Sequence, residues 1–484
     1  MSELLKRDGW LEMTRRKMLG TLLVGMGAVL TGCGVGSVGE KFSTRGRILL
    51  DNLPSYPPGL EEAIRFPLLE AITGRRARRF SLGSEIPDGP LAFKSTHEPK
   101  PLDELEQMLV VTAVAGSTGW HHMIYRNARY APHLANYSMA AGGRTFPSAA
   151  GFHTSEVFYT DDNGVYFLPT RDSGSLLEKG GDGEWDLNKW LQAHKSRVQK
   201  IAEGRLNIPP EEPFMEGHNT WCVNRPGSTV IFPVADLAQH HLGILCFLVQ
   251  NGYCIYDDMN NKPIPGMEKF KTLVDVEHPY PMTFIDQYAL SEASVEIACA
   301  CYAGMLTLQA LGLGGWMFDG LDRHTVLGAS GRPDIPGLGF RYDTDPRWPL
   351  PNLTGKANLF EAFCPPHYPN MRAATEAIVE RKYGPGGPFN PETPGPWKDT
   401  RKVRGSAQVH NEEFKDCVAT MAQYVYDKFG KYPATVPSTF VIMYLQAHHE
   451  ELDFYNQHFS PGAYLHTHAR HMEMWHGGRR QKRR

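Results

Sequence analysis

Histidine is concentrated near the C-terminus of this 484-residue chain, between residues 448 and 476. Neutral imidazole together with carboxylate is a good ligand set for zinc, copper or iron. Glu450, Glu451 and Asp453 lie beside the first two histidines, so we expect a divalent metal site in this tail. The candidate ligands are His448, His449, His466, His468 and His471, and the same stretch also holds His458 and His476.

A second interpretation of the tail is open. The spacing of its histidines matches no familiar metal motif, and Tyr444, Tyr455, Tyr464 and Trp475 stand among them. Histidines in such surroundings also serve as half-buried hydrogen-bonding residues. Spacing and residue types therefore leave both a metal site and a polar part of the core open.

A basic cluster offers a different chemistry. The stretch AITGRRARRF (71–80) carries Arg75, Arg76 and Arg79. A guanidinium group can meet a phosphate group with two parallel hydrogen bonds, so these residues are candidate phosphate ligands. The alternative is an ordinary solvated helix end.

Two runs of small residues are candidate contacts for a planar ring. They are Ser148-Ala149-Ala150-Gly151, which follows Pro147, and Gly314-Gly315. Small side chains let backbone N–H groups approach a ring closely, and hydrogen bonds to ring nitrogens tune a reduction potential. For Pro147 and Ser148 the alternative is a plain turn.

Taken in order, three stretches resemble the flavin-dependent nitroreductase family, most closely its azoline-oxidising dehydrogenase branch. They are AITGRRARRF (71–80), GRTFPSAAGFHTSEVFY (143–159) and ALGLGG (310–315), and AVAGSTGWHH (113–122) lies where the family has Ala-Pro-Ser-x-x-Asn. The resemblance implies an α+β, nitroreductase-like fold with helices packed around a mainly antiparallel sheet. It also implies a homodimer that binds FMN at its interface. The implied FMN-binding residues are Arg75, Arg76, Arg79, Ser117, Trp120, Pro147, Ser148, Ala149, Gly151, Gly314 and Gly315.

Two functions follow from these patterns. The first is an FMN-dependent oxidoreductase that passes hydride or electrons from a reduced donor through FMN to a small organic acceptor. The second is a flavin-free binding protein of the same fold, with a metal site in the histidine tail. Two departures from the family favour the second function: Trp120 replaces an asparagine and cannot accept its hydrogen bond, and the phosphate cluster lacks a serine.

The N-terminus reads as an export signal. Thr14-Arg15-Arg16-Lys17-Met18-Leu19 resembles the twin-arginine motif, and the apolar run that follows is too short to span a bilayer. It ends in Leu30-Thr31-Gly32-Cys33, which resembles a lipobox. We expect export by the twin-arginine machinery and a lipid on Cys33. The protein would then be a membrane-tethered lipoprotein of the periplasm or cell surface.

These residues must be positioned by the rest of the chain. We expect a leader (1–33), a tether (34–60), a nitroreductase-like domain (61–345) with an insertion at about 172–290, a Pro/Gly-rich linker (346–398) and a mainly helical C-terminal region (399–484). Within the domain, Asp161-Asp162-Asn163-Gly164 predicts a hairpin turn. The patterns predict helices over 185–204 and 292–313, the second apolar on all sides and therefore buried.

Composition excludes some classes of partner. The formal net charge is −3, which argues against a general nucleic-acid binder because phosphate binding needs a concentrated cationic surface. Eight cysteines are too few for a disulfide scaffold, although a single bridge such as Cys364 with Cys417 stays open.

Overall fold

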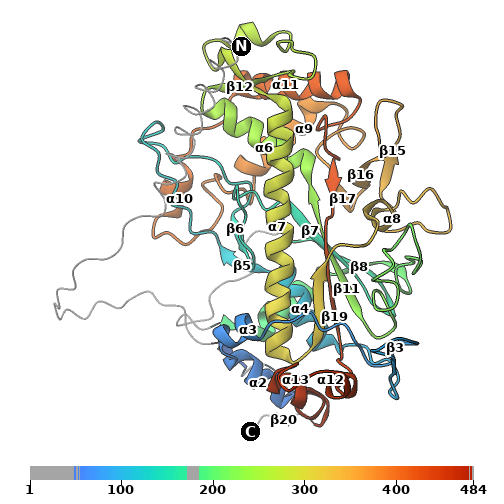
Figure 1. Ribbon diagram of the computed structural model, residues 1–484. Helices are drawn as coiled ribbons and strands as arrows, with labels where there is room; N and C mark the ends of the chain where they lie inside the picture. Colours follow the sequence, from blue (N-terminus) through green and yellow to red (C-terminus); the bar gives the residue numbers. More distant parts are fainter. Residues whose placement is uncertain (1–47, 51–52, 54, 172–184, 479, 482–484) are drawn as a thin grey trace, which may run out of the picture. The chain divides into compact units, whose positions relative to one another are not determined.

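A mostly antiparallel sheet and a long helix organise the molecule (Figure 1). The computed structural model describes residues 48–50, 53, 55–171, 185–478 and 480–481. The predicted leader, with Cys33, and most of the predicted tether lie outside these residues. The described part mixes helix and sheet, which confirms the α+β class at that level.

The main sheet has seven strands in the order β10-β8-β7-β11-β19-β14, with β18 paired to β11, and every pairing is antiparallel. Its strands are β7 (Ser155–Thr160), β8 (Gly164–Leu168), β10 (Gln199–Glu203), β11 (Thr229–Asp236), β14 (Gly314–Phe318), β18 (Thr439–Phe440) and β19 (Tyr444–His448). The turn between β7 and β8 is the predicted hairpin at Asp161–Gly164, where the Asp161 carboxylate accepts the N–H groups of Asn163 and Gly164.

The central helix α7 (Met282–Leu311) packs against α4 (Glu104–Ala115), α6 (Leu237–Gln250) and the sheet. It is the expected apolar helix, although it begins ten residues before the predicted start at 292. Among the described residues it alone has the length and apolar character to cross a membrane. Half of its most apolar window is buried, as expected for the core helix of a folded domain.

The remaining helices lie around this core: α2 (Pro58–Arg65), α3 (Leu68–Gly74), α5 (Leu187–Lys195), η2 (Met267–Phe270), α8 (Arg323–Leu327), α9 (Met371–Tyr383), α10 (Thr400–Arg404), α11 (Glu412–Phe429), α12 (Leu452–His458), α13 (His466–His471) and the π-helical turn η3 (Met472–His476). The smaller sheets use β1 (Ile48–Leu49), β2 (Ser55–Tyr56), β3 (Glu85–Ile86), β4 (Phe93–Lys94), β5 (Ser117–Trp120), β6 (Gly142–Arg144), β9 (Trp185–Asp186), β12 (Tyr253–Tyr256), β13 (Asp275–Pro281), β15 (Arg341–Asp343), β16 (Asn352–Lys356), β17 (Phe360–Glu361) and β20 (Arg480–Gln481).

Three segments differ from the sequence expectations. The helix expected over 185–204 ends at Lys195, and Gln199–Glu203 forms strand β10, because pairing with β8 overrides the helical pattern. The stretch 346–398 folds into β16, β17 and α9 and packs against α11. The C-terminal region supplies β18 and β19, and β19 is an interior strand of the main sheet. All seven cysteines in the described residues are free thiols, so Cys364 and Cys417 form no bridge.

His194 shows how the fold holds a neutral imidazole. Its Nδ1–H donates to the Trp190 carbonyl oxygen at 2.8 Å, and its Nε2 accepts the Ser117 N–H at 2.9 Å. Burial lowers the pKa of this imidazole to about 4, against a smaller opposing effect of the Trp190 carbonyl. Both ring nitrogens are therefore used in the neutral form, and a proton on Nε2 would break the bond to Ser117.

This arrangement predicts an acid-sensitive stability. The unfolded imidazole takes up a proton near pH 6.5 and the native one only near pH 4, so stability present at pH 7 is lost as the pH falls through this window. The loss amounts to about 3 kcal/mol by pH 4. In urea unfolding at pH 7 and pH 4.5, His194→Gln should show a smaller drop in the free energy of unfolding than the unsubstituted chain. The exposed His133→Gln is the control, and equal drops in all three proteins would contradict the prediction.

Candidate metal centre

Four side chains from distant parts of the chain converge at one end of α7. Glu106 lies in the first turn of α4, His449 directly follows β19, His471 ends α13 and His476 ends η3. Glu106, His449 and His471 are almost fully buried, whereas the side chain of His476 is 18% exposed. One potential ligand atom from each residue lies within 4.8 Å of all the others. Only a small part of the cluster reaches solvent, through His476.

The distances fit a single small ion. Glu106 Oε1 lies 3.0 Å from Nε2 of His471 and 3.0 Å from Nε2 of His476. His449 Nε2 lies 3.1 Å from His476 Nε2 and 3.5 Å from Glu106 Oε1. Four ligands placed tetrahedrally at zinc bond lengths are separated by about 3.3 Å. These four separations are close to four of the six edges of such a tetrahedron, and the other two are at most 4.8 Å.

Backbone groups orient the ligands. His449 Nδ1 donates to the Lys100 carbonyl at 2.9 Å, and His471 Nδ1 donates to the Leu311 carbonyl at 2.8 Å. A neutral imidazole with its proton on Nδ1 keeps its lone pair on Nε2, so both residues present a lone pair to the cluster. Glu106 Oε2 accepts the Asp103 N–H at 2.7 Å in a capping box, which leaves Oε1 for a ligand.

The cluster has a strong electrostatic character. Burial alone would raise the pKa of the Glu106 carboxyl, but His449, His471 and His476, which donate to it when Nε2 carries a proton, hold that pKa well below its usual range. Glu106 is thus a buried anion whose compensation comes from three imidazoles.

Local helix geometry brings His471 and His476 together. They are five residues apart, a separation that an ordinary α-helix places on different faces. The chain between them forms the π-helical turn η3, in which residues five apart lie one above the other. The sequence patterns therefore include His476 without selecting it as a ligand, and they do not select Glu106 at all.

Three of the predicted ligands lie outside the cluster. His466 is on the surface between Glu62 and Glu70, at 3.3 and 3.2 Å. His468 accepts the Leu465 N–H at Nδ1, so its proton lies on Nε2, which then cannot bind a metal. His448 belongs to β19 and points to the opposite side from His449, since successive strand residues alternate. Of the five predicted histidines, the structure brings only His449 and His471 together.

His448 packs against Trp316, with ring centres 5.9 Å apart, and His468 lies beside a second buried group around Glu450. Arg78 Nε lies 3.7 Å from Glu450 Oε1, and His468 Nε2 lies 3.7 Å from Glu450 Oε2. Burial raises the pKa of the Glu450 carboxyl to about 8, and Arg78 opposes this shift. Arg78 also donates to the carbonyl oxygens of Ala463 and Gly74. This group joins the chain after α3 to the start of the C-terminal helices.

The predicted phosphate arginines point in different directions. The exposed Arg76 follows α3 and donates to the backbone carbonyls of Thr73 and Arg75 at the C-terminal end of that helix. Arg75 itself is half-buried at the C-cap of α3. Arg79 stacks over Trp316 and Phe318, with its guanidinium carbon 5.1 and 4.7 Å from the ring centres. Within one chain the three guanidinium groups do not share a partner among the described contacts.

The predicted glycine pair packs against protein. A Cβ atom on Gly314 would lie 2.7 Å from His448 Nε2, and one on Gly315 would lie 2.1 Å from the Gln446 carbonyl oxygen. Gly315 has φ +145° and exchanges backbone hydrogen bonds with Arg78. These glycines therefore let β14 lie close to β19, and they meet the arginine segment there.

The other predicted residues lie elsewhere. Ser148 bonds to Glu296, near the middle of α7, while Pro147 and Ala149 are exposed and Gly151 is half-buried. Ser117 and Trp120 belong to β5, which pairs with β6 just before this turn. Glu296 and Leu311 are fifteen residues apart in α7, or about 22 Å. The predicted flavin residues thus form two separate groups in a single chain, one beside Glu296 and one at the end of α7.

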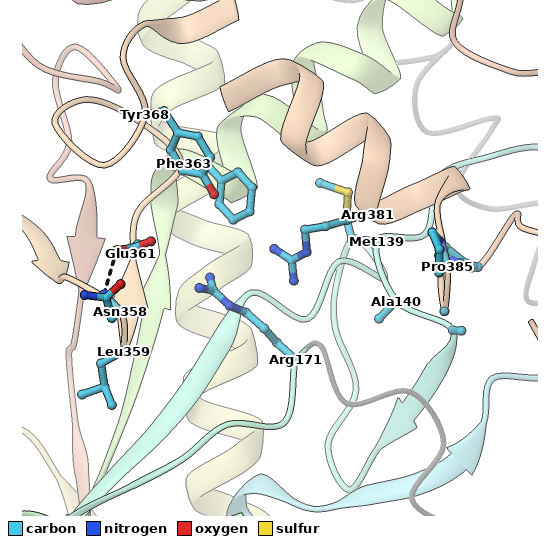
Figure 2. Close-up of a pocket in the computed structure, with 14 residues that line it drawn as sticks. Met139, Ala140, Arg171, Asn358, Leu359, Glu361, Phe363, Tyr368, Arg381 and Pro385 are labelled. Carbon is cyan, nitrogen blue, oxygen red and sulfur yellow. Dashed lines mark hydrogen bonds between the residues drawn. The ribbon is translucent and has the colours of Figure 1, made fainter. Parts of the chain in front are cut away.

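A cavity of about 520 Å³ lies apart from the cluster (Figure 2). The guanidinium groups of Arg171 and Arg381 point toward each other across it, and Phe363 stacks on Tyr368 with ring centres 5.0 Å apart. Arg171 is bound to Asp236 at 3.1 Å and to Gln239 at 2.8 Å. None of the cluster residues and none of the predicted flavin residues lines this cavity.

Comparisons with known proteins give little support for any family. No family model matches the sequence, and no curated protein matches it. One solved structure, a candidate nitroreductase from Ralstonia eutropha, is similar to 54% of this chain and 72% of its own, with 12% identity and a TM-score of 0.26. A similarity at this level does not establish a shared fold.

Proposed function

We propose that this protein binds one divalent transition-metal ion through Glu106, His449, His471 and His476. The observation that carries the proposal is the convergence of three Nε2 atoms and one carboxylate oxygen, with two imidazoles held by backbone carbonyls. Two imidazole nitrogens 3.1 Å apart, one with its lone pair directed inward, repel each other unless a proton or a cation lies between them. A metal ion removes this repulsion and completes the charge balance of Glu106.

The ligand types narrow the choice of ion. Imidazole suits zinc, copper, iron and nickel, whereas magnesium and calcium prefer sites built from oxygen atoms. The cluster contains no thiolate, which disfavours Cu(I). Zinc, iron(II), cobalt, nickel and copper(II) are thus the ions to test.

Metal analysis of untagged protein tests this proposal. We expect about one zinc or other first-row ion per chain by plasma mass spectrometry. His476→Ala should lose most of the metal, because it removes one of four ligands at the least buried position. His466→Ala is the matched control, since His466 lies in the same tail but binds Glu62 and Glu70. Absence of stoichiometric metal, or equal loss in both variants, would refute the site.

The FMN-dependent oxidoreductase stays a second proposal. It is supported by the sequence resemblance, and a homodimer would reconcile it with the two separate groups of predicted residues. A single chain does not bring these residues together, so FMN would have to contact the end of α7 from one subunit and the turn beside Glu296 of the partner subunit. When bound, FMN would supply hydride transfer from a donor to an acceptor.

An exposed stripe on α7 supports such a dimer. Phe284, Val295 and Tyr302 are between 39% and 46% exposed, and their spacing puts them on one face with Tyr288 and Leu306. Apolar side chains in a row on a core helix favour an interface with a second copy. Antiparallel packing of two such helices about Tyr302–Leu306 would place Gly314 of one chain near the level of Glu296 of the partner subunit.

The dimer can be tested without reference to flavin. Light scattering during gel filtration should give twice the mass of one chain, and Val295→Lys with Tyr302→Lys should give the monomer, because charges would be buried at the interface. Val409→Lys is the control, since Val409 is 65% exposed and lies outside α7. A monomeric unsubstituted protein would contradict the dimer.

The absorption spectrum of the purified protein tests whether it binds FMN. Purified protein should absorb in the flavin bands and release FMN on denaturation, and Arg75→Ala with Arg76→Ala should lower the FMN content without unfolding the chain. Arg65→Ala is a control because this exposed arginine precedes the cluster. A colourless protein that added FMN does not reconstitute would exclude this function.

Export by the twin-arginine route and lipidation at Cys33 complete the proposal. They are supported by the order of the arginine pair, the apolar run and the lipobox-like end in the sequence. They predict a protein tethered to a membrane outside the cytoplasm.

A further inference from the structure

We infer that the metal is a zinc ion with a structural role: it clips the C-terminal segment Leu465–His476 onto the end of α7. This inference rests on the proposed metal site and adds what the ion does there. It follows from the closed coordination of the site and from the groups that the segment covers.

The coordination leaves no place for a substrate. Glu106 uses Oε2 to accept the Asp103 N–H, so it offers the metal one oxygen and the site has four protein ligands. Structural zinc sites have four protein ligands, whereas catalytic ones keep a position for water or substrate. Three of the four ligands are almost fully buried, and the cavity in Figure 2 is lined by other residues. A closed tetrahedral site suits zinc, which has no preference for higher coordination.

The C-terminal segment satisfies the end of the central helix. The last carbonyl groups of a helix lack partners within it. Here Thr467 Oγ1 donates to the Gln309 carbonyl at 2.7 Å, and His471 Nδ1 donates to the Leu311 carbonyl at 2.8 Å. Gly312, with φ +76°, ends the helix where a Cβ atom would lie 2.2 Å from the Thr467 carbonyl oxygen. His471 thus binds the helix end through one nitrogen and faces the metal with the other.

The same segment covers the buried Glu450 carboxyl group and a buried aromatic residue. His468 lies beside Glu450, and Arg78 donates to the Ala463 carbonyl just before the segment. Trp475 is 4% exposed and packs against Gly59, where a Cβ atom would lie 2.2 Å from its Nε1. Release of the segment would therefore bring water to Glu450 and expose the indole ring. The clip connects α4 with β19 and the last helices, which follow α4 by more than 300 residues in the sequence.

Hydrogen exchange on the full chain tests the clip. Removal of the metal with dipicolinate should increase exchange of the amides in Leu465–Gly478 and at the C-terminal end of α7 by at least about tenfold, with α11 unchanged. One equivalent of zinc should restore protection, and magnesium should not. His476→Ala should behave like the metal-free protein, His476→Cys should regain protection with zinc because a thiolate is also a zinc ligand, and His466→Ala should behave like the unsubstituted protein.

The outcomes separate the two claims. Stoichiometric metal whose removal leaves exchange of this segment unchanged would overturn the clip while the metal site stands. Restoration by iron(II) but not by zinc would overturn the zinc assignment. A chain without stoichiometric metal would overturn the metal site itself, and the clip with it. If dipicolinate unfolds the whole chain, His476→Ala, which changes the least buried ligand, provides the same comparison without chelator.

Discussion

The buried carboxylate of Glu106 is the constraint on which one end of the molecule depends. An isolated anion in a protein interior costs far more than a domain's net stability unless it is compensated. Part of the compensation is local, because the first turn of α4 directs N–H groups toward the carboxylate. The rest comes from His449, His471 and His476, which the chain can deliver only when β19 is inserted in the sheet and the C-terminal helices are docked. One side chain therefore links the first long helix, an interior strand and the C-terminus.

The central helix α7 shows the same principle at its buried Glu296. Glu296 accepts the N–H groups of His153 and Thr154 and the hydroxyl groups of Ser148 and Ser155. Burial would raise the pKa of Glu296, but His240, His153 and these hydroxyl groups lower it. The Pro-Ser turn thus has a structural reason of its own, since it supplies donors to a carboxylate in the core. The residues that resemble a flavin-binding turn are therefore also accounted for by their hydrogen bonds to Glu296.

The sequence predicted what depends on near neighbours in the chain. The hairpin at Asp161–Gly164 and the apolar helix α7 are predictable from sequence, because turn residues and apolar periodicity are properties of neighbouring residues. The local pattern of strand β10 predicts helix, because the pairing of β10 with β8 is a tertiary effect that local periodicity does not encode. The metal-ligand cluster depends even more on contacts between distant parts of the chain. The histidines of the tail indicate a metal site. Whether His448 or His449 faces the cluster depends on which elements pack on each face of β19, which the sequence does not show. Glu106 is 343 residues from His449, so their proximity is a purely tertiary effect. His476 reaches the cluster because the chain before it forms a π-helical turn, and no periodicity in the sequence predicts that turn.

The proposed export signal and the proposed metal site are consistent with each other. Three of the four proposed ligands are almost fully buried, so an ion would enter while the C-terminal segment is undocked, either during folding or when that segment opens. The identity of an ion that is bound during folding depends on which metals are present in the compartment where the chain folds. The twin-arginine route carries proteins that are already folded, so a chain exported that way would keep an ion chosen in the cytoplasm. The same reasoning applies to FMN, so a twin-arginine leader would be consistent with either a metal ion or FMN. The proposed metal site rests instead on the convergence of Glu106 with three imidazoles, an observation that is independent of the leader.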